Sequence, residues 1–428
     1  MTAGETHQAI EATFRIERAR LIAGLARLVR DIDRAEELAQ DALVIALSEW
    51  PRTGVPANPG AWLMTTAKRR AIDAIRRDRM RDRKHEEIAR DLDGATGGGA
   101  EAIEATMDDD VGDELLGLIF TACHPVLSAD ARAALTLRVI GGLTTDEIAR
   151  AFLSSEATIA QRIVRAKKTI AKAGLSFEAP RRAERAARLP SVLEVIYLIF
   201  NEGYAATAGD DLVRPNLCLE AQRLGRMLAG LMPEDAEVFG LLALMEIQAS
   251  RLQARIGPDG AFVPLTEQNR ARWDQLLIRR GLDALARADA LSKGAGGGAH
   301  MSGWGPYALQ AALAACHARA RSAADTDWPR IAALYDQLRA AAPSPVVDLN
   351  RAIAHSMAFG PEAGLRLVDA LADAAALRNY APLPAARGDF LFRAGRLAEA
   401  RAEFEAAAKL TRNAREAAFL LARADACG

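Results

Sequence analysis

Apolar residues recur every three or four positions along most of the chain, which is the spacing of one face of an α-helix. Near the N-terminus this pattern covers residues 7–29, 33–49 and 60–84. Within the second stretch, for example, Ala35 and Leu38 fall on the same predicted face. Ala and Leu dominate and runs of β-branched residues are scarce, so the pattern predicts an all-α fold.

Residues 143–172 predict two short helices with a tight joint between them. Thr144 is followed three positions later by Glu147, the arrangement of a capping box that begins a helix. Ser154 and Ser155 favour a turn and a new N-cap, because serine hydroxyls compete with helical hydrogen bonding. The first helix therefore ends near residue 153 and a second begins, which predicts a helix-turn-helix.

The second helix of this pair has one apolar and one polar face. Its apolar residues, at steps of four, three and four, are Ile159, Ile163, Ala166 and Ile170. On the opposite side, or at the start of the helix, lie side chains that can reach DNA bases or phosphates. These are Glu156, Thr158, Gln161, Arg162, Arg165 and Lys168. A cationic amphipathic helix is usually only a solvated surface helix, so residues upstream must decide between the two interpretations.

Charge is distributed unevenly along the 428 residues, whose formal net charge of -1 argues against a uniformly basic nucleic-acid coat protein. Residues 62–90 contain ten Lys and Arg against five acids, whereas residues 91–114 contain nine acids and no base. Residues 91–111 are also rich in Gly and read as a flexible acidic linker. The sequence thus predicts two small helical domains, residues 1–90 and 112–176, joined by that linker.

Three motifs in this order carry a family resemblance. They are AEELAQD at residues 35–41, AWL at 61–63 with Ala67, Ile72-Asp73 and Arg76-Arg77, and LTLR at 135–138 with Leu143, Ile148-Ala149, Thr158 and residues 162–166. The set resembles the sigma-70 family of bacterial RNA polymerase initiation factors, in particular the extracytoplasmic-function group that keeps only regions two and four. Arg69 stands where the family commonly has Asn, and Ala160 replaces a more usual Lys.

The resemblance implies a role for each helix. Region two docks the clamp helices of the polymerase core through Glu36, Glu37, Gln40 and Asp41. It also binds and melts the downstream promoter element through Asn58, Trp62, Lys68, Arg69, Arg70, Arg76 and Arg77. Region four binds the polymerase flap, and its second helix reads the upstream promoter element. Two plainer interpretations stay open: Trp62 as an ordinary core residue, and Glu36 with its neighbours as a solvated helix face.

The rest of the chain is not part of a minimal sigma factor with regions two and four. It resembles the helical C-terminal extension that one subgroup of extracytoplasmic-function sigma factors carries. Residues 387–410 predict a helix, a Gly-centred turn and a second helix, as in a tetratricopeptide repeat. Gly360 and Gly395 are 35 positions apart, close to the length of such a repeat, and residues 328–342 form a third candidate. We expect a helical extension domain over residues 189–290 and TPR-like repeats over 304–428.

Residues 197–204, YLIFNEGY, end an apolar helix with a carboxylate, an amide and a tyrosine. They either line a ligand pocket or form a helix C-cap around Gly203. Because no nucleophile and base can be paired there, we predict no enzyme activity. The four cysteines lack zinc-ligand spacing, and no apolar run is long enough to span a bilayer. We therefore expect no metal, no cofactor and no membrane contact, in a cytoplasmic protein.

The sequence as a whole favours an alternative sigma factor that binds polymerase core and promoter DNA. In this interpretation the C-terminal domain contacts region two or region four of the same chain and regulates it. The alternative is a one-component regulator, in which the C-terminal helices sense a ligand or partner and the helix-turn-helix binds an operator.

Overall fold

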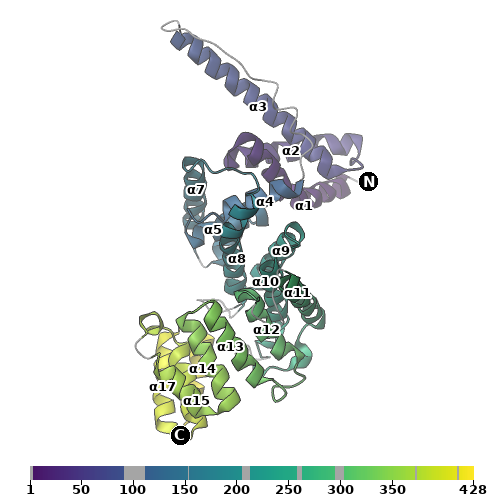
Figure 1. The fold of residues 1–428 in the computed structure, drawn as a ribbon. Coiled ribbons are helices and arrows are strands. Elements are labelled where there is room, and N and C mark those ends of the chain that lie inside the picture. The colour runs from purple at the N-terminus through teal and green to yellow at the C-terminus, as the bar shows by residue number, and fades with distance from the viewer. Residues whose placement is uncertain are drawn as a thin grey trace. The chain divides into compact units, whose positions relative to one another are not determined.

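The computed structural model describes residues 3–90, 111–152, 154–204, 213–257, 263–294, 303–371, 374–411 and 414–428. The secondary structure of these residues is helical throughout, without strands, which confirms the predicted all-α class. The chain divides into two compact units, Met1–Val195 (unit 1) and Ile196–Gly428 (unit 2) (Figure 1). Each unit is described separately below.

Unit 1 begins with three helices that pack against one another. They are α1 (Ala3–Val29), α2 (Ile32–Thr53) and α3 (Pro59–Arg90), and the C-terminal part of α3 projects beyond its neighbours (Figure 1). The second predicted stretch ends at residue 49, and this end is wrong. The helix continues to Thr53 and ends at Gly54, whose φ of 85° favours glycine and whose N–H donates to the Trp50 carbonyl. Ile16 of α1 is 71% exposed, so not every apolar residue of this helix lies on its packed face.

The second half of unit 1 contains the helix-turn-helix. Its elements are α4 (Val111–Ala122), α5 (Ala129–Thr136), the π-helical turn η2 (Leu137–Gly141), α6 (Thr145–Ala151) and α7 (Glu156–Lys172). The first part of α8 (Arg182–Tyr204) belongs to the same unit: Arg188 donates to the Phe120 carbonyl at 2.7 Å, and Ser191 to the Cys123 carbonyl at 2.5 Å.

Unit 2 consists of successive helix pairs with two larger apolar cores, one around α10 to α13 and one around α14 to α18, and a smaller cluster of Ala254, Trp273 and Ile278. Its α-helices after α8 are α9 (Pro215–Leu231), α10 (Ala236–Ala249), α11 (Gln275–Gly294), α12 (Pro306–Arg319), α13 (Trp328–Ala341), α14 (Pro345–Phe359), α15 (Pro361–Asp369), α16 (Pro382–Arg393), α17 (Leu397–Leu410) and α18 (Ala414–Asp425). Short 3-10 turns occupy Leu252–Ala254 (η3), Arg270–Arg272 (η4) and Ala375–Leu377 (η5).

Two helix pairs of unit 2 each meet at a glycine that the sequence analysis names. Helices α16 and α17 meet at Gly395, with φ of 77°, and α14 and α15 meet at Gly360, with φ of 93°. The residues expected on the inner face of α17, Ala400, Phe404 and Ala407, are all buried. Helical pairing at a repeat spacing near 35 residues is therefore confirmed for these two pairs.

Gly203 plays a different part from the predicted left-handed cap. Helix α8 continues through Tyr204, and Gly203 is absent from the positive-φ residues of the described chain. A Cβ at Gly203 would lie 2.7 Å from the Cys218 backbone nitrogen, so this glycine permits close packing of α8 on α9. The predicted linker, residues 91–111, lies outside the described residues except for Val111, where α4 starts.

Candidate nucleic-acid and polymerase interface

Local hydrogen bonds fix the first residues of both helices of the helix-turn-helix, as the sequence predicts. The Thr144 hydroxyl accepts from the Glu147 N–H, and the Glu147 carboxylate accepts from the Thr144 N–H at 2.8 Å, which completes the capping box. Ser155 caps α7 by accepting from the Thr158 N–H at 3.1 Å. The four apolar residues of α7 are all buried, so this helix presents its other face outward.

The outward face of α7 carries the side chains that the sequence assigns to DNA. Glu156, Thr158, Gln161, Arg165 and Lys168 are exposed. Arg162 is half-buried and lies 3.5 Å from the Asp130 carboxylate at the start of α5. Thr158, Gln161, Arg162 and Arg165 line one wall of a groove of about 380 Å³, with Val126, Ser128 and Ala131 among the residues opposite.

The basic residues of α3 do not all share one environment. Arg69, Arg70, Arg76 and Arg77 are exposed, and Arg70 lies 3.6 Å from Asp41 of α2. Lys68 is different, because its ammonium lies 3.9 Å from the buried carboxylate of Glu114 on α4. The structure thus brings four of the five predicted cations of α3 to its exposed side and turns Lys68 toward the second half of unit 1.

Asn58 and Trp62 lie at the start of α3. The Asn58 side chain accepts from the Ala61 N–H at 3.1 Å and so caps the helix, while the residue itself stays exposed. Trp62 is half-buried and packs edge-on against the buried ring of Trp50, with 5.3 Å between the ring centroids. The Trp62 ring is therefore held against Trp50 while part of it remains accessible to solvent.

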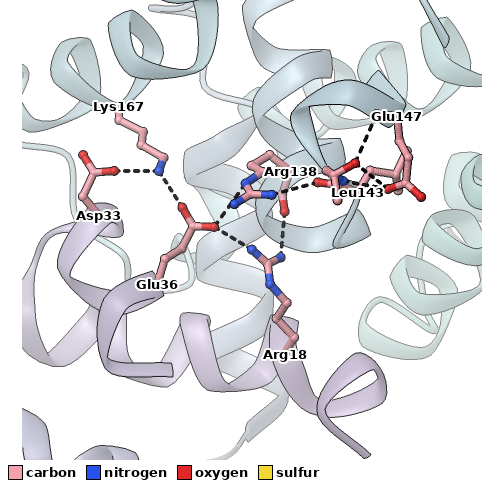
Figure 2. Close-up of polar contacts among 8 residues, drawn as sticks. Arg18, Asp33, Glu36, Arg138, Leu143, Glu147 and Lys167 are labelled. Atoms are coloured by element: carbon pink, nitrogen blue, oxygen red, sulfur yellow. Dashed lines mark hydrogen bonds and ion pairs between the residues drawn. The ribbon is translucent and has the colours of Figure 1, made fainter. Parts of the chain in front are cut away.

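The acidic face of α2 splits into a covered and an open part. Glu37, Gln40 and Asp41 are exposed, whereas Glu36 is only 8% exposed. Figure 2 shows three cationic side chains around Glu36, one from α1 and two from the second half of unit 1. The nearest distances from the Glu36 carboxylate are 2.6 Å to Arg18, 3.5 Å to Arg138 and 2.5 Å to Lys167.

Further contacts extend this Glu36 network, defined here as Arg18, Asp33, Glu36, Arg138 and Lys167 (Figure 2). Lys167 also lies 2.7 Å from Asp33, and Arg18 donates to the Arg138 carbonyl at 2.7 Å. Burial lowers the pKa of the Arg18 guanidinium, and the Glu36 carboxylate opposes that shift. The network binds α2 to η2 and α7 of the same unit.

Sequence reasoning missed this network. Arg18, Arg138 and Lys167 lie on three separate elements, and no common spacing in the sequence relates them. One local signal was present: Lys167 follows the buried Ala166 and precedes the exposed Lys168, so it sits at the edge of the apolar face of α7.

Family models match three parts of the chain. Sigma-70 region 2 matches residues 14–81, Sigma-70 region 4 matches residues 118–170, and a family of unknown function, DUF6596, matches residues 188–289. Unit 1 therefore contains two sigma regions in this order, the first with a long basic helix and the second with a helix-turn-helix. Together they define a bipartite transcription initiation factor. The chain belongs to the sigma-70 family, as an extracytoplasmic-function-like member with a C-terminal extension.

The chain is 42% identical over 409 residues to an uncharacterized protein from Rhizobium meliloti (strain 1021), covering 95% of this chain and 93% of that protein. The similarity therefore includes the C-terminal extension as well as the sigma regions. No solved structure was found to match the chain. Among the described residues, no helix is long and apolar enough to cross a membrane, and no group of His, Cys, Asp and Glu is arranged to hold a metal ion.

Proposed function

We propose that this chain binds the core of RNA polymerase and directs initiation at a two-part promoter, with the C-terminal extension regulating that activity. The observation that carries the proposal is the pairing of two exposed basic helices within unit 1. Helix α7 exposes Gln161, Arg165 and Lys168 over a buried apolar face, and α3 exposes a row of arginines.

Helix α7 reads the upstream promoter element from the major groove. Gln161, Arg162 and Arg165 have the planar amide or guanidinium groups that form two hydrogen bonds to one base, each such pair contributing about 1–3 kcal/mol of discrimination. Arg162 can exchange its contact with Asp130 for a base, because that pair is 3.5 Å long and Asp130 is solvent-accessible. Lys168 binds a phosphate, which adds affinity without sequence preference.

Helix α3 holds the downstream element while its strands separate. Arg69, Arg70, Arg76 and Arg77 neutralise phosphates, and the half-buried ring of Trp62 offers a stacking surface at the start of the helix. Lys68 joins this row only if it leaves Glu114, so we assign it a smaller share of the binding than the four arginines.

Polymerase docks on the open part of α2 through Glu37, Gln40 and Asp41. Glu36 takes part only when Lys167 and Arg138 withdraw from it, since both belong to the second half of unit 1. Docking through Glu36 thus requires the two sigma regions to separate from one another.

The test is runoff transcription with purified core polymerase and a promoter found by mapping transcript starts after overexpression. We expect promoter-dependent RNA that Arg165→Ala reduces by roughly the value of one bidentate pair, about 1–3 kcal/mol. Arg20→Ala, which changes an exposed arginine of α1, serves as the matched control and leaves transcription unchanged. A footprint on DNA without polymerase, and no promoter-dependent RNA with it, would instead identify a one-component regulator.

Regulation by the extension is tested with a shortened chain. Residues 177–195 pack on region four, since a Cβ on Gly117 would lie 2.1 Å from the Phe177 carbonyl and Arg188 binds the Phe120 carbonyl. The chain should therefore end after Val195 and not after Ser176, so that region four keeps these contacts. Identical transcription by the shortened and full chains under every condition tried would contradict a regulatory extension.

A further inference from the structure

Arginines alternate with aromatic rings in one part of unit 2. The Arg255 guanidinium lies 4.1 Å from the centre of the Tyr204 ring, and Arg251 lies 5.7 Å from Tyr204 and 5.8 Å from Trp273. The Arg270 guanidinium lies 5.0 Å from the centre of the Trp273 ring. We call these five residues the arginine–aromatic cluster. They come from the end of α8, the segment after α10 and the turn η4, so that the fold gathers positive charge from three separate segments.

Two of these arginines, Arg251 and Arg270, form no direct ion pair, although the carboxylate of Asp325 acts on Arg270 from farther away. Within the described residues no carboxylate lies within 4.0 Å of Arg251 or Arg270. Arg270 is held by neutral acceptors instead: the carbonyls of His317 and Ala320 at 2.5 and 2.7 Å, and the Thr326 hydroxyl at 2.9 Å. Among the described residues, the charge of Arg251 is therefore not paired with a carboxylate, and that of Arg270 is opposed only by Asp325, which is not in direct contact.

Buried N–H groups in the cluster also lack acceptors. Arg251 is 7% exposed and Trp273 is 3% exposed, yet Arg251 Nε and Trp273 Nε1 have no hydrogen-bond partner among the described residues. Buried polar groups are almost always paired in folded proteins, with protein, water or a bound ligand. Each of these two donors therefore needs an acceptor that the described residues do not supply.

Stacking leaves these donors available. A guanidinium that lies over an aromatic ring uses its flat face, whereas all of its N–H bonds lie in its plane. Arg251 lies near both the Tyr204 and the Trp273 rings, and its Nε–H, which has no partner among the described residues, can still donate to an oxyanion. The indole N–H of Trp273 is a donor only, so it also requires an acceptor.

The side chains around the cluster respond to its charge. Burial, with a further contribution from Arg251 and Arg270, lowers the pKa of His317 to about 3. His317 packs edge-on against Trp328 at 5.3 Å, which adds another aromatic wall on the α13 side. Because His317 stays neutral, the cations of the cluster are its three arginines.

We propose that the arginine–aromatic cluster binds an oxyanion, the carboxylate or phosphate group of a small molecule, through Arg251 and Trp273. The aromatic rings hold the guanidinium in place and exclude water, and Arg251 Nε and Trp273 Nε1 donate to the anion. That this ligand is the signal read by the extension rests on the proposed function, whereas its binding to unit 2 does not.

The experiment is thermal unfolding of the full chain in sodium phosphate, in sodium acetate and in sodium chloride at equal ionic strength. We expect one of the two oxyanions at saturating concentration to raise the Tm by about 3 °C over chloride. Arg251→Met keeps the length of the side chain, removes the charge and the donors, and should abolish this increase. Arg280→Met, on the exposed side of α11, is the matched control that keeps it.

Trp273→Phe provides a second variant in case Arg251→Met does not fold. It keeps a ring for the two arginines to stack on and removes only the N–H donor, so we expect the affinity for the oxyanion to fall about tenfold. Equal increases in Tm for wild type, Arg251→Met and Trp273→Phe would show only general salt stabilisation and would overturn the proposal, as would the lack of any increase in the wild type. Because no polymerase is involved, either result is independent of the transcription assay.

Discussion

The Glu36 network and the arginine–aromatic cluster bury arginine in two opposite ways. In unit 1, Arg18 and Arg138 meet the carboxylate of Glu36, and Lys167 joins Glu36 to Asp33. In unit 2, Arg251 and Arg270 meet aromatic faces and neutral acceptors. In the first arrangement every cation lies beside a carboxylate, so the arrangement stabilises the contact between the two sigma regions. The second leaves charge and donors unused, which is the condition of a binding site and not of a structural clamp.

Removing Glu36 should have the largest effect on stability. Glu36→Ala leaves three cations without their shared carboxylate in a mostly buried site, so we expect unit 1 to lose about 3–5 kcal/mol of unfolding free energy. Urea unfolding followed by circular dichroism measures the loss. Glu37→Ala, on the exposed side of the same helix, is the control and should change stability by less than about 0.5 kcal/mol. Equal effects of the two substitutions would mean that the network contributes no stability.

The adjacent residues Lys167 and Lys168 are expected to have different roles: Lys167 stabilises the contact between the sigma regions, and Lys168 binds DNA. Lys167→Ala breaks the ion pairs with Asp33 and Glu36 and should reduce the stability of unit 1 by about 1–3 kcal/mol. Lys168→Ala should leave stability unchanged and lower the slope of log affinity against log salt by about 1, because one phosphate contact is lost. The slope is measured with polymerase holoenzyme and promoter DNA over a sodium chloride series. A lower salt slope in Lys167→Ala alone would reverse the two assignments.

The depressed pKa of His317 predicts how unit 2 responds to acid. In the folded chain this imidazole has a pKa of about 3, well below the value near 6.5 of an unfolded histidine. The unfolded state therefore binds a proton first as the pH falls below 6.5, and stability decreases across that range. We expect His317→Asn to lose about 1 kcal/mol less than the wild type between pH 7 and pH 5.5, measured by urea unfolding at both pH values. Parallel decreases would indicate that His317 titrates normally.

The smallest expected effect on stability is that of removing Arg251. Arg251→Met in chloride buffer removes a buried cation that has no carboxylate partner, so the change in unfolding free energy should stay within about 1 kcal/mol of zero. A loss as large as that of Glu36→Ala would show that Arg251 is a structural group, in contrast to its proposed role. Urea unfolding of both variants under identical conditions provides this comparison.

Much of the fold follows from short-range patterns in the sequence. The capping box at Thr144 and Glu147, the N-cap at Ser155 and the buried face of α7 depend on residues three or four positions apart. The turn at Gly395 depends on one residue that accepts a positive φ. Such features are readable because the hydrogen bonds and side-chain contacts that produce them lie within one or two turns of the chain. The end of α2 was misplaced by a few residues, since Pro51 lies in the last turn and Gly54 ends the helix.

The sequence by itself determined an all-α chain, its repeats, the two faces of α7 and the family to which the chain belongs. Only the tertiary structure decided that Glu36 is covered while Glu37 is open, and that Lys68 faces Glu114. It also brought Tyr204, Arg251 and Trp273 together. Each of these environments joins residues more than 15 positions apart, and it depends on how whole helices pack. Helical periodicity fixes the face on which a side chain lies, but the packing of distant helices decides whether that face meets solvent, an opposite charge or an aromatic ring.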